Sequence, residues 1–321
     1  MESIGNPIMW TLFAAFVVFA LLIDFFAMNK QGAHKVTIKE AAVWSVVWVG
    51  VSFVFLAGLW FYLDANTTRE IANAKALEFL TGYVIEKALA IDNIFVFLMV
   101  FTYFAVPLEF QKRVLMIGIL GALVLRAGMI LGGAWLISEF HWVLYLFGAF
   151  LVVTGIKMWW AAGQEPDLGD NPALKFVRKH LKIAPHYDGE RFTTAIDGVK
   201  HYTPLFVVIV LISIVDVIFA VDSIPAIFAI TTDPFIVLTS NVFAILGLRA
   251  MYFLLASMHD KFHLLSYGLA IVLVFIGTKM LLIDLYKIPV SWSLGFTVLT
   301  LALTMVLSVL IPPRDDKTGA A

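Results

Sequence analysis

The sequence contains no cysteine and has few charged residues, only 14% of its 321 positions. Without cysteine the chain can form no disulfide, offers no thiolate to a metal and has no thiol redox chemistry. Its formal net charge of −1 argues against nucleic-acid binding, for which a basic excess is expected. All seven histidines fall in loops or at the ends of hydrophobic runs, so a zinc or copper site within those runs is not indicated.

Long hydrophobic runs dominate what is present. With 61% hydrophobic residues, the chain has too little polar surface for a soluble domain of this size. A membrane-spanning helix needs about 20 apolar residues. The sequence therefore predicts an all-α polytopic membrane protein with about nine transmembrane helices. The runs are 7–28, 41–63, 77–105, 114–137, 141–160, 203–229, 235–256, 264–283 and 290–311.

The distribution of basic residues predicts the orientation. Lys and Arg are concentrated after the first, third, fifth and seventh runs and in the C-terminal tail, whereas the other loops hold only Arg69, Lys75 and Lys287. Because basic loops stay in the cytoplasm, we expect the N-terminus outside and the C-terminus inside.

Two of the runs carry acids near their middle in the same pattern. Glu86, five residues, then Asp92, Asn93 and Ile94 in the third run match Asp216, five residues, then Asp222, Ser223 and Ile224 in the sixth. A carboxylate at the centre of a spanning helix costs about 2.5–3.5 kcal/mol on insertion scales. Acids placed there indicate a function.

The similarity between the two parts extends further along the chain. Leu125-Arg126-Ala127 corresponds to Leu248-Arg249-Ala250, and Gly155-Ile156-Lys157-Met158 corresponds to Gly277-Thr278-Lys279-Met280. Spans three to five are thus expected to repeat as spans six to eight. Since each unit has three helices, the second would be inverted, an arrangement typical of transporters. The expected units are 1–74 with two helices, 75–160 and 203–285 as the repeats, 161–202 as a cytoplasmic connector, and 286–321 with the last helix and tail.

The acids and their polar neighbours suit a hard divalent cation, because carboxylate, amide and hydroxyl oxygens are the ligands that Mg²⁺, Ca²⁺ and Mn²⁺ prefer. We expect metal ligands at Glu86, Asp92, Asn93, Asp216 and Asp222, supported by Ser223, Pro225, Arg126 and Arg249. On a continuous helix the second acid of each pair points about 120° away from the first. Either the acids serve two interfaces, or the helices unwind so that both converge. Pro225 favours unwinding of the sixth span, since it leaves the carbonyl of Val221 without a donor.

Several of these charges have a structural alternative. Arg126 and Arg249 could neutralise two of the carboxylates as buried pairs. Lys87 is either a counter-ion of Glu86 or directed at another helix, and Lys157 and Lys279 are expected to reach the membrane interface. Asp24 and Glu78 are expected to be boundary residues, although Glu78 could line an outer vestibule.

The connector carries two local patterns. Residues 173–184 read ALKFVRKHLKIA, which predicts a short basic amphipathic helix, either on the inner leaflet or as a solvated connector. Asp197-Gly198 between two β-prone segments predicts a hairpin.

Three segments carry a resemblance to a known family. GYVIEKALAIDNIFVF, GILGALVLRA and SIVDVIFAVDSIPAIFAITTDPFIVLTSNVFAILGLRAMYFLL resemble the TerC family of integral membrane proteins, strongly over 75–285, and the full length is similar to its Alx-like branch. The resemblance implies an inner-membrane protein of the LysE-type transporter group that exports Mn²⁺. It also implies that the acidic positions of the family correspond to Glu86, Asp92, Asp216 and Asp222, with Asn93 beside them.

The expected function is therefore export of a divalent cation, Mn²⁺ before Ca²⁺ or Mg²⁺, with no organic cofactor and no enzymatic activity. Its expected partners are the cation and membrane lipid, and proton coupling is left open. Two alternatives remain: a membrane-bound redox modulator, which the lack of cysteine and of cofactor motifs disfavours, and an accessory protein that delivers metal to secretion machinery.

Overall fold

The computed structural model describes residues 3–29, 37–162, 174–175, 179–196, 198–256 and 264–311. Within these ranges, the side chains of residues 24–29, Asp92 and Phe95 are outside the description. The described chain is mostly helical. Its first half contains α1 (Pro7–Asn29), α2 (Ile38–Asn66), α3 (Arg69–Tyr103), α4 (Leu108–Glu139) and α5 (Val143–Ala161). Strands β1 (Thr193–Ile196) and β2 (Val199–Tyr202) precede α7 (Pro204–Phe228), α8 (Pro234–Ile245), α9 (Leu248–Ala256), α10 (Leu265–Leu281) and α11 (Val290–Leu310).

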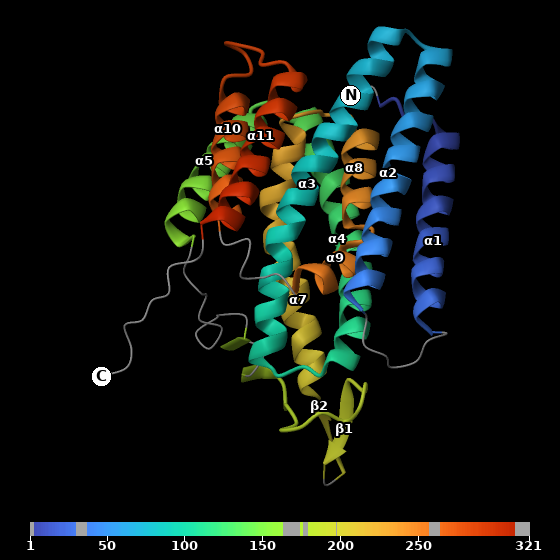
Figure 1. Ribbon diagram of the computed structural model, residues 1–321, viewed down its shortest axis with the longest axis vertical. Coiled ribbons are helices and arrows are strands. Elements are labelled where there is room, and N and C mark those ends of the chain that lie inside the picture. The colour runs from blue at the N-terminus through green and yellow to red at the C-terminus, as the bar shows by residue number, and fades with distance from the viewer. Residues whose placement is uncertain are drawn as a thin grey trace.

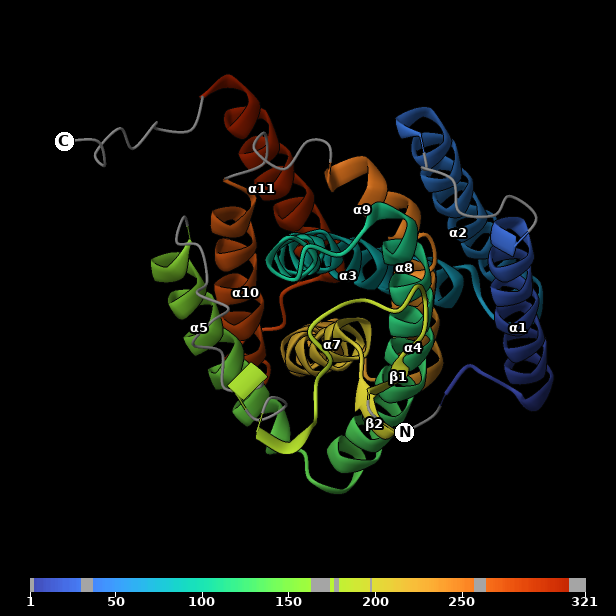
Figure 2. The same ribbon diagram turned by 90° about the horizontal axis from the view of Figure 1, so that it is seen from below.

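Most helices run along the long axis of the molecule, and the hairpin β1–β2 projects at one end (Figure 1). Figure 2 shows α3 and α7 near the centre, with α4, α8 and α9 on one side, α5 and α10 on the other, and α1 and α2 at an edge. Contacts between α3 and α7, α3 and α8, and α4 and α7 build the centre of the bundle. The helices that carry the paired acids are therefore also the innermost ones.

Several helices are long and apolar enough to span a membrane. Among the described residues, α2, α4, α5, α7 and α11 are long and apolar enough, and α8 with α9 makes a sixth if the bent pair counts as one span. Helix α10 and the apolar part of α1 are also apolar, but they are shorter than these spans. The prediction of a helical, multi-pass membrane protein is confirmed in this form, while the count of nine spans stays a prediction.

Two helices begin earlier than the apolar runs indicate. Helix α3 starts at Arg69 rather than residue 77, because the Thr68 side chain caps it by accepting from the Ile71 backbone N–H at 3.3 Å. Helix α4 starts at Leu108 rather than residue 114. Hydrophobicity marks the part of a helix that lies in apolar surroundings, whereas capping marks where the helix begins.

The seventh predicted span is interrupted. It forms α8 and α9, bent by 42° at Leu246 and Gly247. Gly247 has φ +82°, and a Cβ there would lie 2.7 Å from Trp48 Cβ on α2. The break thus needs a residue without a side chain, for both its backbone angle and its packing.

The predicted hairpin is confirmed, because β1 and β2 pair antiparallel with Ile196 opposite Val199. Part of the predicted amphipathic helix lies outside the described residues, but Leu174 is buried against Val207 and Leu211 of α7. Nearby, the Tyr187 hydroxyl donates to the Phe104 carbonyl at 2.6 Å, and burial raises the pKa of Tyr187 to about 12. This part of the connector therefore packs against the helix ends.

Candidate functional site

Arg126 of α4 is the centre of a buried polar cluster between α3, α4 and α7. Its Nη1 donates to Glu86 Oε1 of α3 and, at 3.2 Å, to Ser223 Oγ of α7. Its Nη2 and Nε donate to the two oxygens of Asp216 on α7, at 3.1 and 3.4 Å. All four side chains are buried, with Glu86 and Ser223 only 1% exposed. Arg126 therefore forms buried pairs with two of the acids, as the structural alternative predicted.

The cluster has more negative than positive groups. Two carboxylates face one guanidinium, and Glu86 Oε2 is buried without a hydrogen-bond partner in the described structure. An unpartnered carboxylate oxygen in a low-dielectric interior is costly, because neither water nor a donor replaces its lost hydration. The cluster can therefore bind one further positively charged group.

Asp222 is not part of this cluster. It is half-buried on the face of α7 that meets α5, where it interacts with Thr154 and Lys157. Helix α7 is continuous from Pro204 to Phe228, so Asp216 and Asp222 point to different neighbours as regular helix geometry requires. The expectation that Pro225 unwinds this helix is wrong, because Pro225 lies within its last turn.

The remaining predicted ligands are placed separately. Asn93 is 5% exposed on α3, and the side chain of Asp92, on the same continuous helix, is outside the description. Arg249 is half-buried on α9. Among the described side chains, no group of three or more His, Asp and Glu could hold a metal ion. The structure thus brings together Glu86, Asp216, Ser223 and Arg126, but not Asp222.

Lys87 faces a different helix from its neighbour Glu86. Its Nζ donates to the carbonyls of Ala244 at 3.0 Å and Leu246 at 3.4 Å, at the break between α8 and α9. A helix end leaves its last carbonyls without intrahelical donors. Lys87 satisfies two of them, which supports the reading that it is directed at another helix.

Glu78, in the third turn of α3, and Asp233, at the N-terminus of α8, form a second cluster. Glu78 Oε2 accepts from the Lys75 ammonium at 2.9 Å and from the Thr231 hydroxyl at 2.6 Å. Asp233 caps α8 by accepting from the Phe235 backbone N–H at 3.0 Å, and it also binds Ser3 and the backbone of Ile4. Glu78 is therefore held by neighbouring side chains at this end of the bundle.

Two features of the polar interior were not expected from the sequence. Lys279, which was expected to reach the membrane interface, is 9% exposed and donates to Ser293 of α11 at 2.9 Å. Asn241 of α8 is fully buried, and neither of its side-chain polar atoms has a hydrogen-bond partner in the described part of the chain. The only signal for Asn241 was its polarity within an otherwise apolar run.

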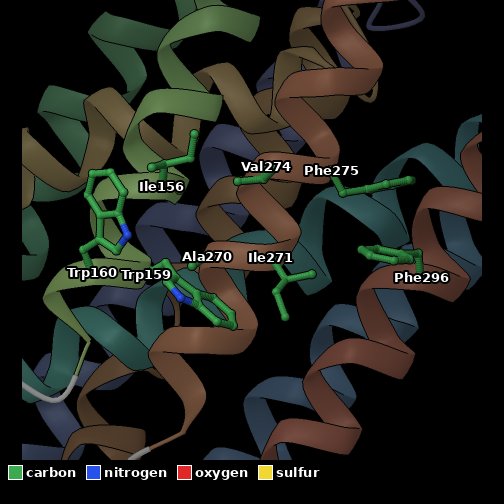
Figure 3. Close-up of a pocket in the computed structure, with 9 residues that line it drawn as sticks. Ile156, Trp159, Trp160, Ala270, Ile271, Val274, Phe275 and Phe296 are labelled. Atoms are coloured by element: carbon green, nitrogen blue, oxygen red, sulfur yellow. The ribbon is translucent and has the colours of Figure 1, made fainter.

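An apolar pocket of about 410 Å³ lies between α5, α10 and α11. Figure 3 shows Trp159 and Trp160 of α5, Phe275 of α10 and Phe296 of α11 around it. Its lining has no carboxylate and no other charged side chain, so it cannot serve as the cation site.

The sequence comparisons agree with this description of a membrane protein. Residues 71–316 match the description "Integral membrane protein TerC family". The chain is 52% identical to the protein named "Putative membrane-bound redox modulator Alx" of Escherichia coli strain K12, over 99% of each chain. It is equally similar, at 52%, to the protein of that name from Photorhabdus laumondii, over 96% of this chain and 97% of the relative.

A further relative is the "Uncharacterized membrane protein STKORF319" of Myxococcus xanthus, 44% identical over 99% of this chain and 97% of its own. No solved structure matches the chain. The matched range covers the buried cluster, both acid patterns and the broken span α8–α9. The chain is an integral, multi-pass membrane protein and belongs to the TerC family.

Proposed function

We propose that the protein exports a divalent cation, Mn²⁺ before Ca²⁺ or Mg²⁺, across the cell inner membrane. The observation that carries the proposal is the buried Glu86–Arg126–Asp216 cluster, which has two carboxylates for one guanidinium and an unpartnered oxygen on Glu86. An intramembrane acid that is incompletely neutralised is expensive and typical of ion pathways. Oxygen ligands favour Mn²⁺, Mg²⁺ or Ca²⁺ over softer metals, and the resemblance to Mn²⁺ exporters selects Mn²⁺.

The proposed path of the cation uses the acids in sequence. Asp92 and Asp222 bind the cation, and Glu86 and Asp216, with Asn93, complete its coordination. Asp222 faces α5 while Asp216 faces α4, so the acids of α7 would act at successive positions rather than in one cage. Exchange of protons on these acids would couple export to the proton gradient.

The proposed architecture has nine spans, an outside N-terminus and a cytoplasmic C-terminus, with α3–α5 and α7–α10 as inverted repeats. Reciprocal contacts between α5 and α10 support the repeat. A Cβ at Gly155 would meet Ala270 and Val274, and a Cβ at Gly277 would meet Gly148 and Val152. Gly155 corresponds to Gly277, and the same offset relates Gly148 to Ala270 and Val152 to Val274. Such reciprocity is expected when a two-fold axis relates two antiparallel helices.

A role as a membrane-bound redox modulator is the second candidate, since the relatives from Escherichia coli and Photorhabdus laumondii carry that name. The sequence has no cysteine, so a bound flavin, haem or quinone would have to supply the redox chemistry. Delivery of metal to secretion machinery is compatible with export and would appear as a co-purifying partner. We assign no enzymatic activity.

Cation flux into proteoliposomes tests the proposal. Purified wild type and an Asp92→Asn, Asp222→Asn double variant would be compared with Mn²⁺, Ca²⁺ and Mg²⁺, with and without a pH gradient. We expect Mn²⁺ flux in the wild type and its loss in the double variant, with both proteins equally inserted. Absence of flux for every cation, together with a cofactor absorption spectrum in the purified protein, would favour the redox role.

A further inference from the structure

Asn241 is a buried polar side chain that the proposed pathway leaves unused. It is fully buried on α8, and both its Oδ1 and its Nδ2 lack partners in the part of the chain that is described. Its neighbours are satisfied: Thr239 Oγ1 donates to the Phe235 carbonyl at 2.7 Å, and Ser240 Oγ to the Val237 carbonyl at 3.2 Å. Asn241 thus differs from the other polar residues of the same helix.

The packing of α8 shows which way Asn241 points. Phe243 packs on Phe13 and Phe16 of α1 and on Phe55 of α2, so its face of α8 is turned toward those helices. Two residues along an α-helix differ by about 200°, which places Asn241 about 160° from Phe243. Asn241 therefore points away from α1 and α2, toward the side where α8 contacts α4 and lies close to α7.

Contacts of neighbouring residues give the position of Asn241 along the bundle axis relative to the Arg126 cluster. A Cβ on Gly82 of α3 would lie 2.9 Å from Ser240 Oγ and 3.5 Å from Ile227 of α7, so these three residues share one level. Glu86 and Ser223 lie one turn further on α3 and α7. Because Lys87 reaches Ala244 and Leu246, α3 and α8 run parallel. With a rise of 1.5 Å per residue, Asn241 is about 5 Å along the axis from Glu86.

Asn241 and Glu86 therefore provide unpartnered oxygens on adjacent helices, facing the interior between α3, α4, α7 and α8. A buried amide that forms no hydrogen bond is disfavoured relative to an apolar side chain of similar shape. An amide oxygen and a carboxylate oxygen together are a ligand pair suited to a hard divalent cation. Arg126 holds the other oxygen of Glu86 and would not need to move.

We propose that Asn241 is a cation ligand on α8 that acts with the free oxygen of Glu86. This inference rests on the proposed function and adds to it a residue outside the two repeated acid patterns. It places a cation position between Asn241 and Glu86, beside the Arg126 cluster, and it gives the broken span α8–α9 a direct role in binding.

Binding of Mn²⁺ to the purified full-length protein tests the inference. Electron paramagnetic resonance of free Mn²⁺ would give the affinity, and tryptophan fluorescence would give the Tm in metal-free buffer. Asn241→Leu should weaken Mn²⁺ binding by at least about tenfold. It should also raise the metal-free Tm, because an unpartnered polar group is replaced by an apolar one. Asn241→Asp, which keeps a ligand oxygen, should retain binding.

Thr239→Val is the matched control, since Thr239 is equally buried on α8 but already hydrogen-bonded; its Mn²⁺ affinity should equal that of the wild type. If the leucine variant does not fold, Asn241→Ala replaces it, and the same loss of Mn²⁺ affinity is expected. Unchanged Mn²⁺ affinity in the Asn241 variant, beside a binding wild type, would overturn this inference alone. A wild type that binds no divalent cation would overturn the proposed function as well.

Discussion

Two polar clusters of the molecule each combine a glutamate and an aspartate with a basic side chain, but in different surroundings. The interior cluster contains Glu86, Asp216 and Arg126. The cluster between the N-terminal part of α3 and the start of α8 contains Glu78, Asp233 and Lys75, and Lys279 is close enough to interact with Glu78. At the helix ends, both oxygens of Asp233 accept hydrogen bonds, two of them from backbone N–H groups. In the interior, Glu86 Oε2 accepts no hydrogen bond from the residues that the structure describes.

The difference comes from the donors that each environment provides. The N-terminus of α8 has free N–H groups and a favourable dipole for Asp233, and Lys75 and Lys279 both interact with Glu78, so the protein itself compensates the acids of this cluster. The interior cluster lies within α3, α4 and α7, which are continuous there, so their backbone N–H groups are already bonded within the helices. We therefore interpret the end cluster as structural and the interior cluster as able to bind a cation.

Arg126→Leu is expected to have the largest effect on stability. It leaves two buried carboxylates without a counter-charge, and breaking such a pair costs about 3–5 kcal/mol. The Tm of the detergent-solubilised protein should fall strongly. The triple variant Arg126→Leu, Glu86→Gln, Asp216→Asn should recover most of the loss, because it removes the uncompensated charges. A single variant that melts like the wild type would show that the acids are neutralised in another way.

Lys87→Met tests the structural role of a lysine ammonium that binds backbone carbonyls rather than carboxylates. It leaves the carbonyls of Ala244 and Leu246 without their donor, and each unsatisfied buried group costs about 1–3 kcal/mol. A lower Tm and faster hydrogen exchange around α9 are expected. Lys39→Met, at an exposed position in the first turn of α2, is the control and should leave both unchanged. Equal behaviour of the two variants would argue against a structural role for Lys87.

Asp233→Ala should have the smallest effect of the three and separates the two clusters by function. Loss of the α8 cap costs about 1–2 kcal/mol, and the contacts with Ser3 and Ile4 are lost with it. We expect a modest fall in Tm with cation flux in proteoliposomes retained. Asp64→Ala, which removes only an exposed pair with Arg69, should change the Tm less. Abolished flux in a folded Asp233 variant would place this cluster in the cation path.

Much of the local structure could be predicted from the sequence. The hydrophobic runs predicted the helices to within a few residues where the apolar run and the helix have the same ends, as in α10 and α11. The Asp197-Gly198 pair gave the hairpin. The angle between Asp216 and Asp222 also followed from their spacing on one helix. These features depend on residues that are near one another in the chain, so they can be derived from it.

The partners of the charged residues could not be predicted in this way. Lys87 and Glu86 are adjacent in sequence yet bind α8 and α4, and the break at Gly247 depends on Trp48 of α2. Lys279 was expected at the interface but is buried beside Ser293.

The sequence by itself determined that this is a helical membrane protein with acids and arginines in its interior, because hydrophobicity and helical spacing are local properties. Only the tertiary structure decided that Arg126 joins Glu86 to Asp216, that Asp222 faces α5, and that Asn241 has no hydrogen-bond partner among the described residues. Those outcomes depend on how helices from distant parts of the chain pack, since packing decides which donors reach each buried oxygen.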